Sequence, residues 1–122
     1  MHINLEAAEN NAIQAYSDNE IQINSIVYER SLIVSKEEII TDLAIKDIQE
    51  IDDHYLQQLM KFKPEVIIIG HKNTGKFAPI TVISQLSQQR IGIECMSIGA
   101  ACRTYNILLG EQRAVVAGFI FS

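Results

Sequence analysis

The chain has 122 residues, 48% of them apolar, and a formal net charge of −5 at pH 7. This length is typical of one domain that buries a core without disulfide bonds, so we expect a single domain over residues 1–122. The acidic balance disfavours nonspecific nucleic-acid binding, and no stretch approaches the ~20 apolar residues that span a bilayer.

The first third of the chain has the pattern of antiparallel strands. Segments 12–17, 21–23 and 26–35 are rich in apolar and β-branched residues. The turn-forming stretches Ser17-Asp18-Asn19-Glu20 and Asn24-Ser25 separate them. Strand patterns bounded by such turns predict an antiparallel hairpin element in front of the rest of the fold.

A short helix is expected after an ambiguous segment at residues 45–51. Asp52 or Asp53 can cap this helix, because an aspartate side chain accepts the backbone N–H groups at a helix start. Three apolar residues then share one helical face: Leu56, Leu59 and Met60. The sequence KFKP at residues 61–64 ends the helix.

The second half of the chain begins with a strand and a second helix. Residues 65–70 are a nearly continuous apolar run, which is typical of a strand buried on both faces. Pro79 is a favourable first residue for a helix that runs to about Arg90. Three residues of this helix are expected to face inward: Val82, Ile83 and Leu86.

A strand at 92–97, a helix at 98–109 and a strand at 113–121 complete the pattern. Gly110 is placed to stop the helix. Alternating strands and helices predict an α/β fold with parallel strands joined by right-handed crossovers. The apolar C-terminal strand is either central in the sheet or an edge that pairs with a partner.

The loop after the first buried strand nearly matches a nucleotide-binding motif. Residues 67–77 read IIIGHKNTGKF, and Phe77 stands where the motif needs Ser or Thr for Mg²⁺. Pro79 delays the following helix, and no second apolar strand ends in the Asp that holds the metal. We therefore interpret the match as chance and the segment as a strand-to-helix loop. His71 is either an acid, base or anion ligand, or an ordinary loop histidine.

The helix predicted at 98–109 carries a core face with a polar group beside it. The core face repeats at helical spacing: Ile98, Ala101, Cys102, Tyr105, Leu108 and Leu109. Gly99, Arg103 and Asn106 fall together beside this face, where they can hold a carboxylate or phosphate. The alternative is structural, with Arg103 bonded to backbone carbonyls or to Glu94.

The two cysteines are predicted to be free and packed. Cys102 lies on the core face, and Cys95 alternates with Ile93 in a strand. Two cysteines without a C-x-x-C motif fit a reducing compartment. The start Met1-His2-Ile3-Asn4 lacks the basic and apolar pattern of a signal peptide. We therefore expect a cytoplasmic protein.

Residues 99–119, GAACRTYNILLGEQRAVVAGF, resemble the signature of a small family of uncharacterised domains. The family includes mitochondrial respiratory complex I assembly factor three and many bacterial and archaeal proteins. Further matches are PEVIIIG at 64–70, FAP at 77–79 and the strand IGIECM at 91–96. The resemblance implies a three-layer α/β domain around a mixed β-sheet and, for the eukaryotic members, assembly through protein contacts.

Two departures from the family pattern bear on its site. The family usually has Asp-Thr where this chain has Ser97-Ile98, so an acid at that position is missing here. The family has Gly-Thr-Gly where this chain has Gly70-His71-Lys72, which makes the site more cationic. The loop at residues 70–78 and the start of the helix at residue 98 both follow predicted strands, and ligands of open α/β sheets bind at such strand ends.

The leading hypothesis is a noncatalytic protein-interaction or assembly-type domain with a small-anion pocket. The expected pocket residues are Gly70, His71, Lys72, Gly99, Arg103 and Asn106. The alternative is an enzyme that acts on an anionic substrate through His71, Lys72 and Arg103. No complete catalytic set is found, and His2, His54 and His71 have no metal-ligand spacing, so we expect neither metal nor cofactor. A protein partner is expected, while self-association and peripheral membrane contact stay open.

Overall fold

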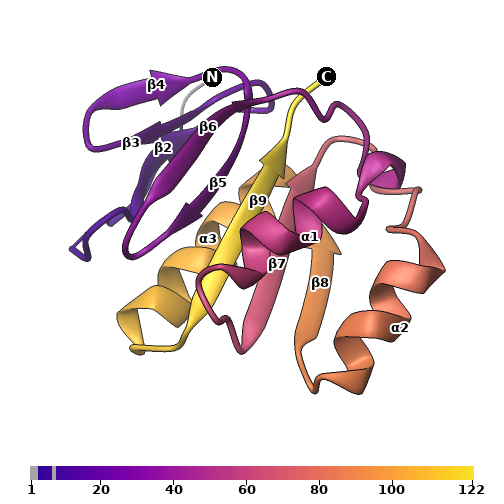
Figure 1. The fold of residues 1–122 in the computed structure, drawn as a ribbon. Helices are drawn as coiled ribbons and strands as arrows, with labels where there is room; N and C mark the ends of the chain where they lie inside the picture. Colours follow the sequence, from indigo (N-terminus) through magenta and orange to yellow (C-terminus); the bar gives the residue numbers. More distant parts are fainter. Residues whose placement is uncertain (1–2, 7) are drawn as a thin grey trace.

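The computed structural model describes residues 3–6 and 8–122. A five-stranded mixed sheet forms the middle of the molecule. Two helices, α1 (Asp53–Met60) and α2 (Ile80–Gln88), cover one face (Figure 1). Helix α3 (Ile98–Gly110) and a four-stranded antiparallel sheet cover the other. This is the predicted α/β class, layered about a mixed sheet. Met1 and His2, which enter the signal-peptide and metal expectations, lie outside the described residues.

The small sheet is a meander of four strands in sequential order. Its strands are β1 (Ile3–Asn4), β2 (Ile13–Tyr16), β3 (Ile21–Ile23) and β4 (Ile26–Tyr28). Asn24 and Ser25 join β3 to β4 with φ angles of 53° and 67°. Two positive φ angles in a two-residue turn match the twist of a hairpin, so the predicted turn is confirmed. Strand β1 was not expected from the sequence pattern.

The large sheet has the strand order β6-β5-β9-β7-β8. Its strands are β5 (Ser31–Ser35), β6 (Ile39–Leu43), β7 (Val66–His71), β8 (Gly92–Met96) and β9 (Val115–Ile120). Strands β7, β8 and β9 are parallel, whereas β5 and β6 are antiparallel to their neighbours. The C-terminal strand β9 is therefore central, which is one of the two alternatives. The run expected at 26–35 divides between the two sheets, and β6 was missed.

Side chains cap three of the described helical elements, and the helix after Pro79 begins without a side-chain cap. The helical elements are η1 (Ile48–Glu50), α1 (Asp53–Met60), α2 (Ile80–Gln88) and α3 (Ile98–Gly110). Asp52 accepts the Tyr55 N–H at 2.9 Å, and Ser97 accepts the Ala100 N–H at 3.3 Å. Gly110 is the last residue of α3, and Gln112 has the positive φ of 63°. The positive φ angle that was expected at Gly110, just after the helix, is therefore found at Gln112, two residues later.

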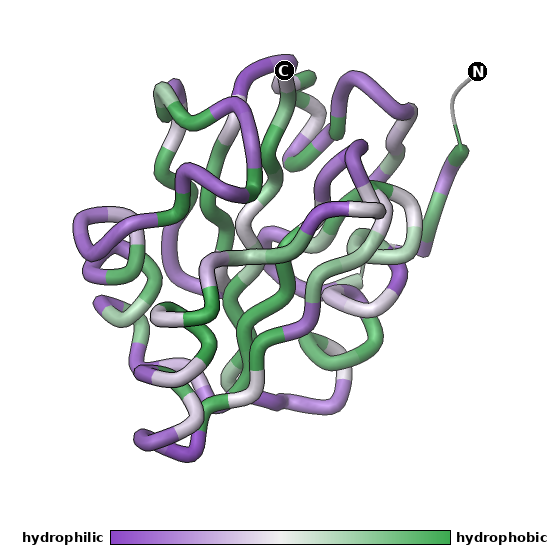
Figure 2. The backbone as a smooth tube through the Cα atoms, turned by 90° about the vertical axis from the view of Figure 1, so that its right-hand side faces the viewer, coloured by the Kyte–Doolittle hydropathy of each residue, from purple (hydrophilic) through white to green (hydrophobic). Residues whose placement is uncertain are grey.

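Two apolar clusters fill the space on either side of the large sheet. Helix α3 packs one cluster against the sheet and the meander. Its predicted core face is buried, with Tyr105 and Cys102 both 0% exposed, except for Leu108, which is only partly buried. Helices α1 and α2 pack the second cluster on the other face. The apolar stretches in Figure 2 accordingly follow the central strands. Val82 and Leu86 of α2 face inward as predicted, but Ile83 is 38% exposed and was wrongly placed in the core.

Candidate functional site

A cavity of about 250 Å³ opens where β7 and β9 end. Its polar lining comes from Lys46, Asp47, His71, Lys72, Asn73 and Ser122. These residues belong to three separate segments: the stretch before η1, the end of β7 with its loop, and the chain end after β9. Carboxyl ends of parallel strands are the usual ligand-binding edge of an α/β sheet. The cavity is therefore the candidate functional site.

His71 is the last residue of β7 and lies beside Ile120 of β9 in the parallel register. The sequence placed it in the loop, but it belongs to the strand and is only 3% exposed. Its Nδ1 atom is buried and has no hydrogen-bond partner among the described residues. Burial lowers the pKa of His71 below its usual value, while the nearby Asp47 carboxylate partly opposes this shift. The imidazole is thus held neutral at physiological pH.

The Asp47 carboxylate is already engaged on both sides. One oxygen accepts the Gln49 N–H at 2.8 Å and starts η1, and the other lies 3.0 Å from the Lys76 ammonium. These two hydrogen bonds, the backbone one first, lower the pKa of Asp47. Asp47 therefore remains ionised, and Lys76 anchors the loop after β7 to the segment before η1.

Lys46 and Lys72 supply positive charge to the cavity without an opposing carboxylate of their own. Neither enters an ion pair among residues 3–6 and 8–122. The Lys72 ammonium donates to Asn19 Oδ1 at 2.8 Å, which leaves other N–H groups for a ligand. The side chains around the cavity thus favour an anion over a cation.

The six site residues predicted from the sequence fall into separate places. His71 and Lys72 line the cavity, whereas Gly70 packs beneath helix α3. A Cβ atom at Gly70 would lie 2.8 Å from the Ala101 side chain and 2.9 Å from the Phe119 ring. Gly70 therefore serves the close approach of α3 to the sheet.

Gly99, Arg103 and Asn106 face the meander from α3. Tyr16 of β2 covers Gly99, and an added Cβ would lie 2.8 Å from its ring. Arg103 Nη1 donates to the Tyr16 hydroxyl at 2.6 Å, so its partner is neither a backbone carbonyl nor Glu94. Asn106 accepts the Ile13 N–H at 2.8 Å and donates to the Ile13 carbonyl at 2.9 Å. These contacts fasten the meander to α3.

Sequence reasoning missed Lys46, Asp47 and Asn73 as neighbours of His71. Lys46 and Asp47 lie in the segment whose structure was ambiguous, and their distance from His71 along the chain hides the contact. The run of polar residues directly after a buried strand was the available signal for Asn73.

The thiols and the buried tyrosine do not form a reactive centre. Burial raises the pKa of Cys102 to about 12 despite the neighbouring Arg103, and it also raises the pKa of Cys95. Cys95 is only partly buried, less than expected. Tyr55 points its hydroxyl at Gly118, and this hydroxyl has no hydrogen-bond partner in the described part of the chain. Burial raises the pKa of Tyr55.

The described residues also bear on two other kinds of site. No helix among them is long and apolar enough to cross a membrane. No group of three or more His, Cys, Asp or Glu side chains in the described part of the chain is arranged to hold a metal ion.

The fold and the cavity define a small α/β domain with a cationic edge at its parallel strands. Residues 13–120 match the family model described as "Protein of unknown function (DUF498/DUF598)". The match spans most of the chain, and the chain belongs to this family.

Relatives of known name and structure cover much of the chain. It is 32% identical over 89 residues to the "13 kDa major membrane protein" of Francisella tularensis subsp. holarctica (strain LVS), which is 72% of each chain. A crystal structure of a Bordetella parapertussis protein has a TM-score of 0.82 and 27% identity, covering 96% of this chain and all of that one. An "outer membrane protein" from Bartonella henselae has a TM-score of 0.76 and 27% identity, covering 93% and 96%.

Proposed function

We propose that the chain is a noncatalytic interaction domain of the assembly type, which docks a protein partner through the exposed side of α2. The observation that carries this proposal is the exposure of large apolar side chains there. Phe77 is 73% exposed, Ile80 78% and Ile83 38%. Their spacing of three residues aligns Ile80 and Ile83 on one side of the helix, with Phe77 just before it.

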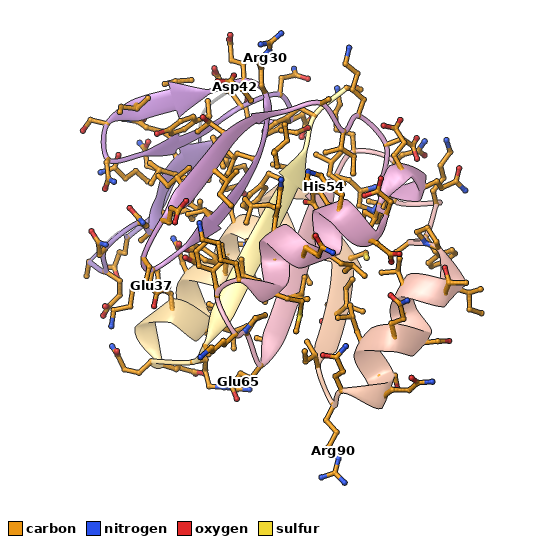
Figure 3. All side chains as sticks on the ribbon, viewed as in Figure 1. Arg30, Glu37, Asp42, His54, Glu65 and Arg90 are labelled. Atoms are coloured by element: carbon orange, nitrogen blue, oxygen red, sulfur yellow. The ribbon has the colours of Figure 1, made fainter. Side chains whose placement is uncertain are left out.

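The docking face carries no charge. Residues 77–89 contain no Asp, Glu, Lys or Arg, although charged residues make up 20% of the chain. Arg90 is the first charged residue after this stretch, and Figure 3 shows its side chain pointing away from the body of the molecule. Depletion of charge around exposed apolar side chains is typical of the centre of a protein interface.

The neighbouring strand offers a second kind of contact. Strand β8 is an edge of the large sheet and pairs only with β7 among the described strands. Its outer backbone groups can add a strand from a partner. Helix α2 and β8 lie at the same margin of the molecule in Figure 1, so both can belong to one interface.

A protein fits this face better than a lipid surface does. Helices that lie on membranes usually combine an apolar face with Lys and Arg that attract anionic lipids, and residues 77–89 have neither base. Two relatives are named as membrane proteins. Together with the resemblance to complex I assembly factors, they support a partner that is part of a membrane-bound complex, and the cytoplasmic location expected from the sequence stays a prediction.

Photo-crosslinking from single positions tests this proposal. A photoreactive amino acid replaces Ile80 in cells that produce the chain, and the matched control replaces Ile107, which is 60% exposed on α3. We expect a discrete protein adduct from position 80 and none from position 107. Equal adducts at both positions, a lipid adduct, or only a dimer of the chain would each contradict a specific protein partner at α2.

A second candidate function, small-anion binding, is favoured by the unpaired His71 ring and the two lysines in the cavity. Of the six residues predicted for the anion pocket, only His71 and Lys72 line the cavity, and Lys46 joins them. The proposed anion site therefore no longer includes Gly70, Gly99, Arg103 and Asn106. The enzyme alternative needed Arg103 beside His71, but Arg103 is bonded to Tyr16. Binding without turnover therefore has the better support.

A further inference from the structure

We propose that the cavity at the end of β7 binds a phosphate dianion through Lys46, His71 and Lys72. The ligand is inorganic phosphate or the phosphate group of a small monoester, which share this chemistry. The inference rests on the anion-binding role proposed for the cavity and names its ligand.

The charge around the cavity matches a dianion. Lys46 and Lys72 line it without ion-pair partners among the described residues. Asp47 is the carboxylate side chain in the lining, and the Lys76 ammonium lies 3.0 Å from it. Two positive charges thus remain among the side chains that line or border the cavity. A carboxylate ligand would neutralise one of them, whereas a phosphate dianion neutralises both.

The donors that line the cavity come from different segments of the chain. Lys46 comes from the segment before η1, His71 from the end of β7, and Lys72 and Asn73 from the following loop. A tetrahedral anion presents several acceptor oxygens in different directions, whereas a planar carboxylate presents two. The arrangement of these donors therefore suits phosphate.

His71 lines the cavity with one edge of its ring. The residue is 3% exposed, and its Nδ1 atom is closed to solvent and makes no hydrogen bond within the described residues. The ring nitrogen left for a ligand is therefore Nε2, and an oxygen held in the cavity can accept from its N–H. Because the ring is neutral, the dianion retains its charge balance with the two lysines.

The size of the cavity limits the ligand. At about 250 Å³ it lies below the range of roughly 300–1,000 Å³ that holds drug-sized molecules. Free phosphate or a monoester with a few carbon atoms fits this space.

Nuclear magnetic resonance of the isotope-labelled full chain tests this inference. The chain is titrated with inorganic phosphate, glycerol 3-phosphate or acetate at constant ionic strength, because screening alone shifts exposed signals. We expect saturable shifts at His71 and Asn73 with both phosphates. Tighter binding of glycerol 3-phosphate would identify a monoester ligand, and tighter binding of inorganic phosphate the free ion.

Matched variants locate the binding. Lys46→Gln and Lys72→Gln should each weaken phosphate binding about tenfold, the loss of one charge-assisted hydrogen bond. Lys36→Gln is the control, because Lys36 follows β5 at the opposite end of the sheet, where Ser35 pairs with Val116. Phosphate affinity unchanged in the two cavity variants would overturn the inference.

The same titrations distinguish an error in the phosphate inference from an error in the proposed anion site. Acetate that saturates the same signals as tightly as phosphate would overturn the phosphate inference but leave the anion site. Saturable shifts with none of the three compounds would overturn both. The crosslinking result at Ile80 is independent of either outcome.

Discussion

Replacing Asn106 with Ala should destabilise the fold without touching the cavity. Strand β1 pairs with β2 at Ala15 and Tyr16, and the Leu5 N–H donates to the Gln14 carbonyl. Beyond Gln14, no described strand pairs with this edge of β2. The Asn106 amide continues the ladder there, bonded at 2.8 Å and 2.9 Å to the N–H and carbonyl of Ile13. The side chain of an alanine cannot make either bond.

The expected loss in the free energy of unfolding is about 2–4 kcal/mol. The two hydrogen bonds to Ile13 contribute roughly 1 kcal/mol each, and the Ile13 backbone groups left without partners cost about 1 kcal/mol more in total. The third bond of the side chain, an exposed one to the Glu6 carbonyl at 3.3 Å, contributes little. Ile13 itself is 0% exposed, so water has poor access to replace the amide. The measurement is urea unfolding followed by circular dichroism, and the thermal midpoint should fall by roughly 10 °C.

The control for Asn106→Ala is Asn10→Ala. Asn10 is exposed and donates one side-chain hydrogen bond, at 2.7 Å to the Lys36 carbonyl, so its loss should cost less than about 1 kcal/mol. If Asn106→Ala were no more destabilising than Asn10→Ala, the structural role of Asn106 would be refuted. If it abolished phosphate binding in a folded chain, Asn106 would belong to the ligand site after all.

Three further substitutions test other parts of the structure. Arg103→Met should lower the free energy of unfolding by only about 0.5–1 kcal/mol, since its bond to Tyr16 is exposed, and calorimetry should show unchanged phosphate affinity. Gly118→Ala should cost about 3 kcal/mol in urea unfolding because its Cβ would collide with the Tyr55 hydroxyl, and adding Tyr55→Phe should recover part of this loss. Burial holds the folded pKa of His71 below its unfolded value of 6.5, so the unfolded chain gains the proton first, and stability should fall as pH drops through 6.5 until folded His71 also protonates. Urea midpoints at about pH 7.5 and about pH 5.5 should therefore differ less in His71→Gln than in the parent chain.

The sequence predicted the elements whose residues are buried by a regular pattern. The run at 66–70 indicated β7, and the stripe through Ala101 and Tyr105 indicated the core face of α3. Strand β6 was missed because it is half exposed and includes Thr41 and Asp42, which break the apolar run. The break at residues 29–30, where the chain leaves one sheet for the other, is fixed by packing between sheets and has no strong turn residue to mark it.

The candidate site was only partly predictable for a similar reason. A polar residue that directly follows a buried strand can be recognised from the local sequence, and this signal identified His71 and Lys72. The approach of Lys46 and Asp47 depends on the path of the chain between β6 and α1, which no local pattern encodes. Gly99, Arg103 and Asn106 share a helix side as predicted, but helical spacing does not reveal that Tyr16 and Ile13 of the meander occupy that side.

The most direct test of the proposed interaction role is the native complex of the chain in cells. Cells whose own gene for this chain has been deleted produce the wild-type chain, Ile80→Asp or Ile107→Asp. Native electrophoresis then measures the size of the assembly that contains each chain. Both substitutions place a charge at an exposed isoleucine, so they differ mainly in location. We expect Ile80→Asp to leave the assembly and Ile107→Asp to remain in it. Retention of Ile80→Asp in an assembly of unchanged size and amount would contradict docking through α2.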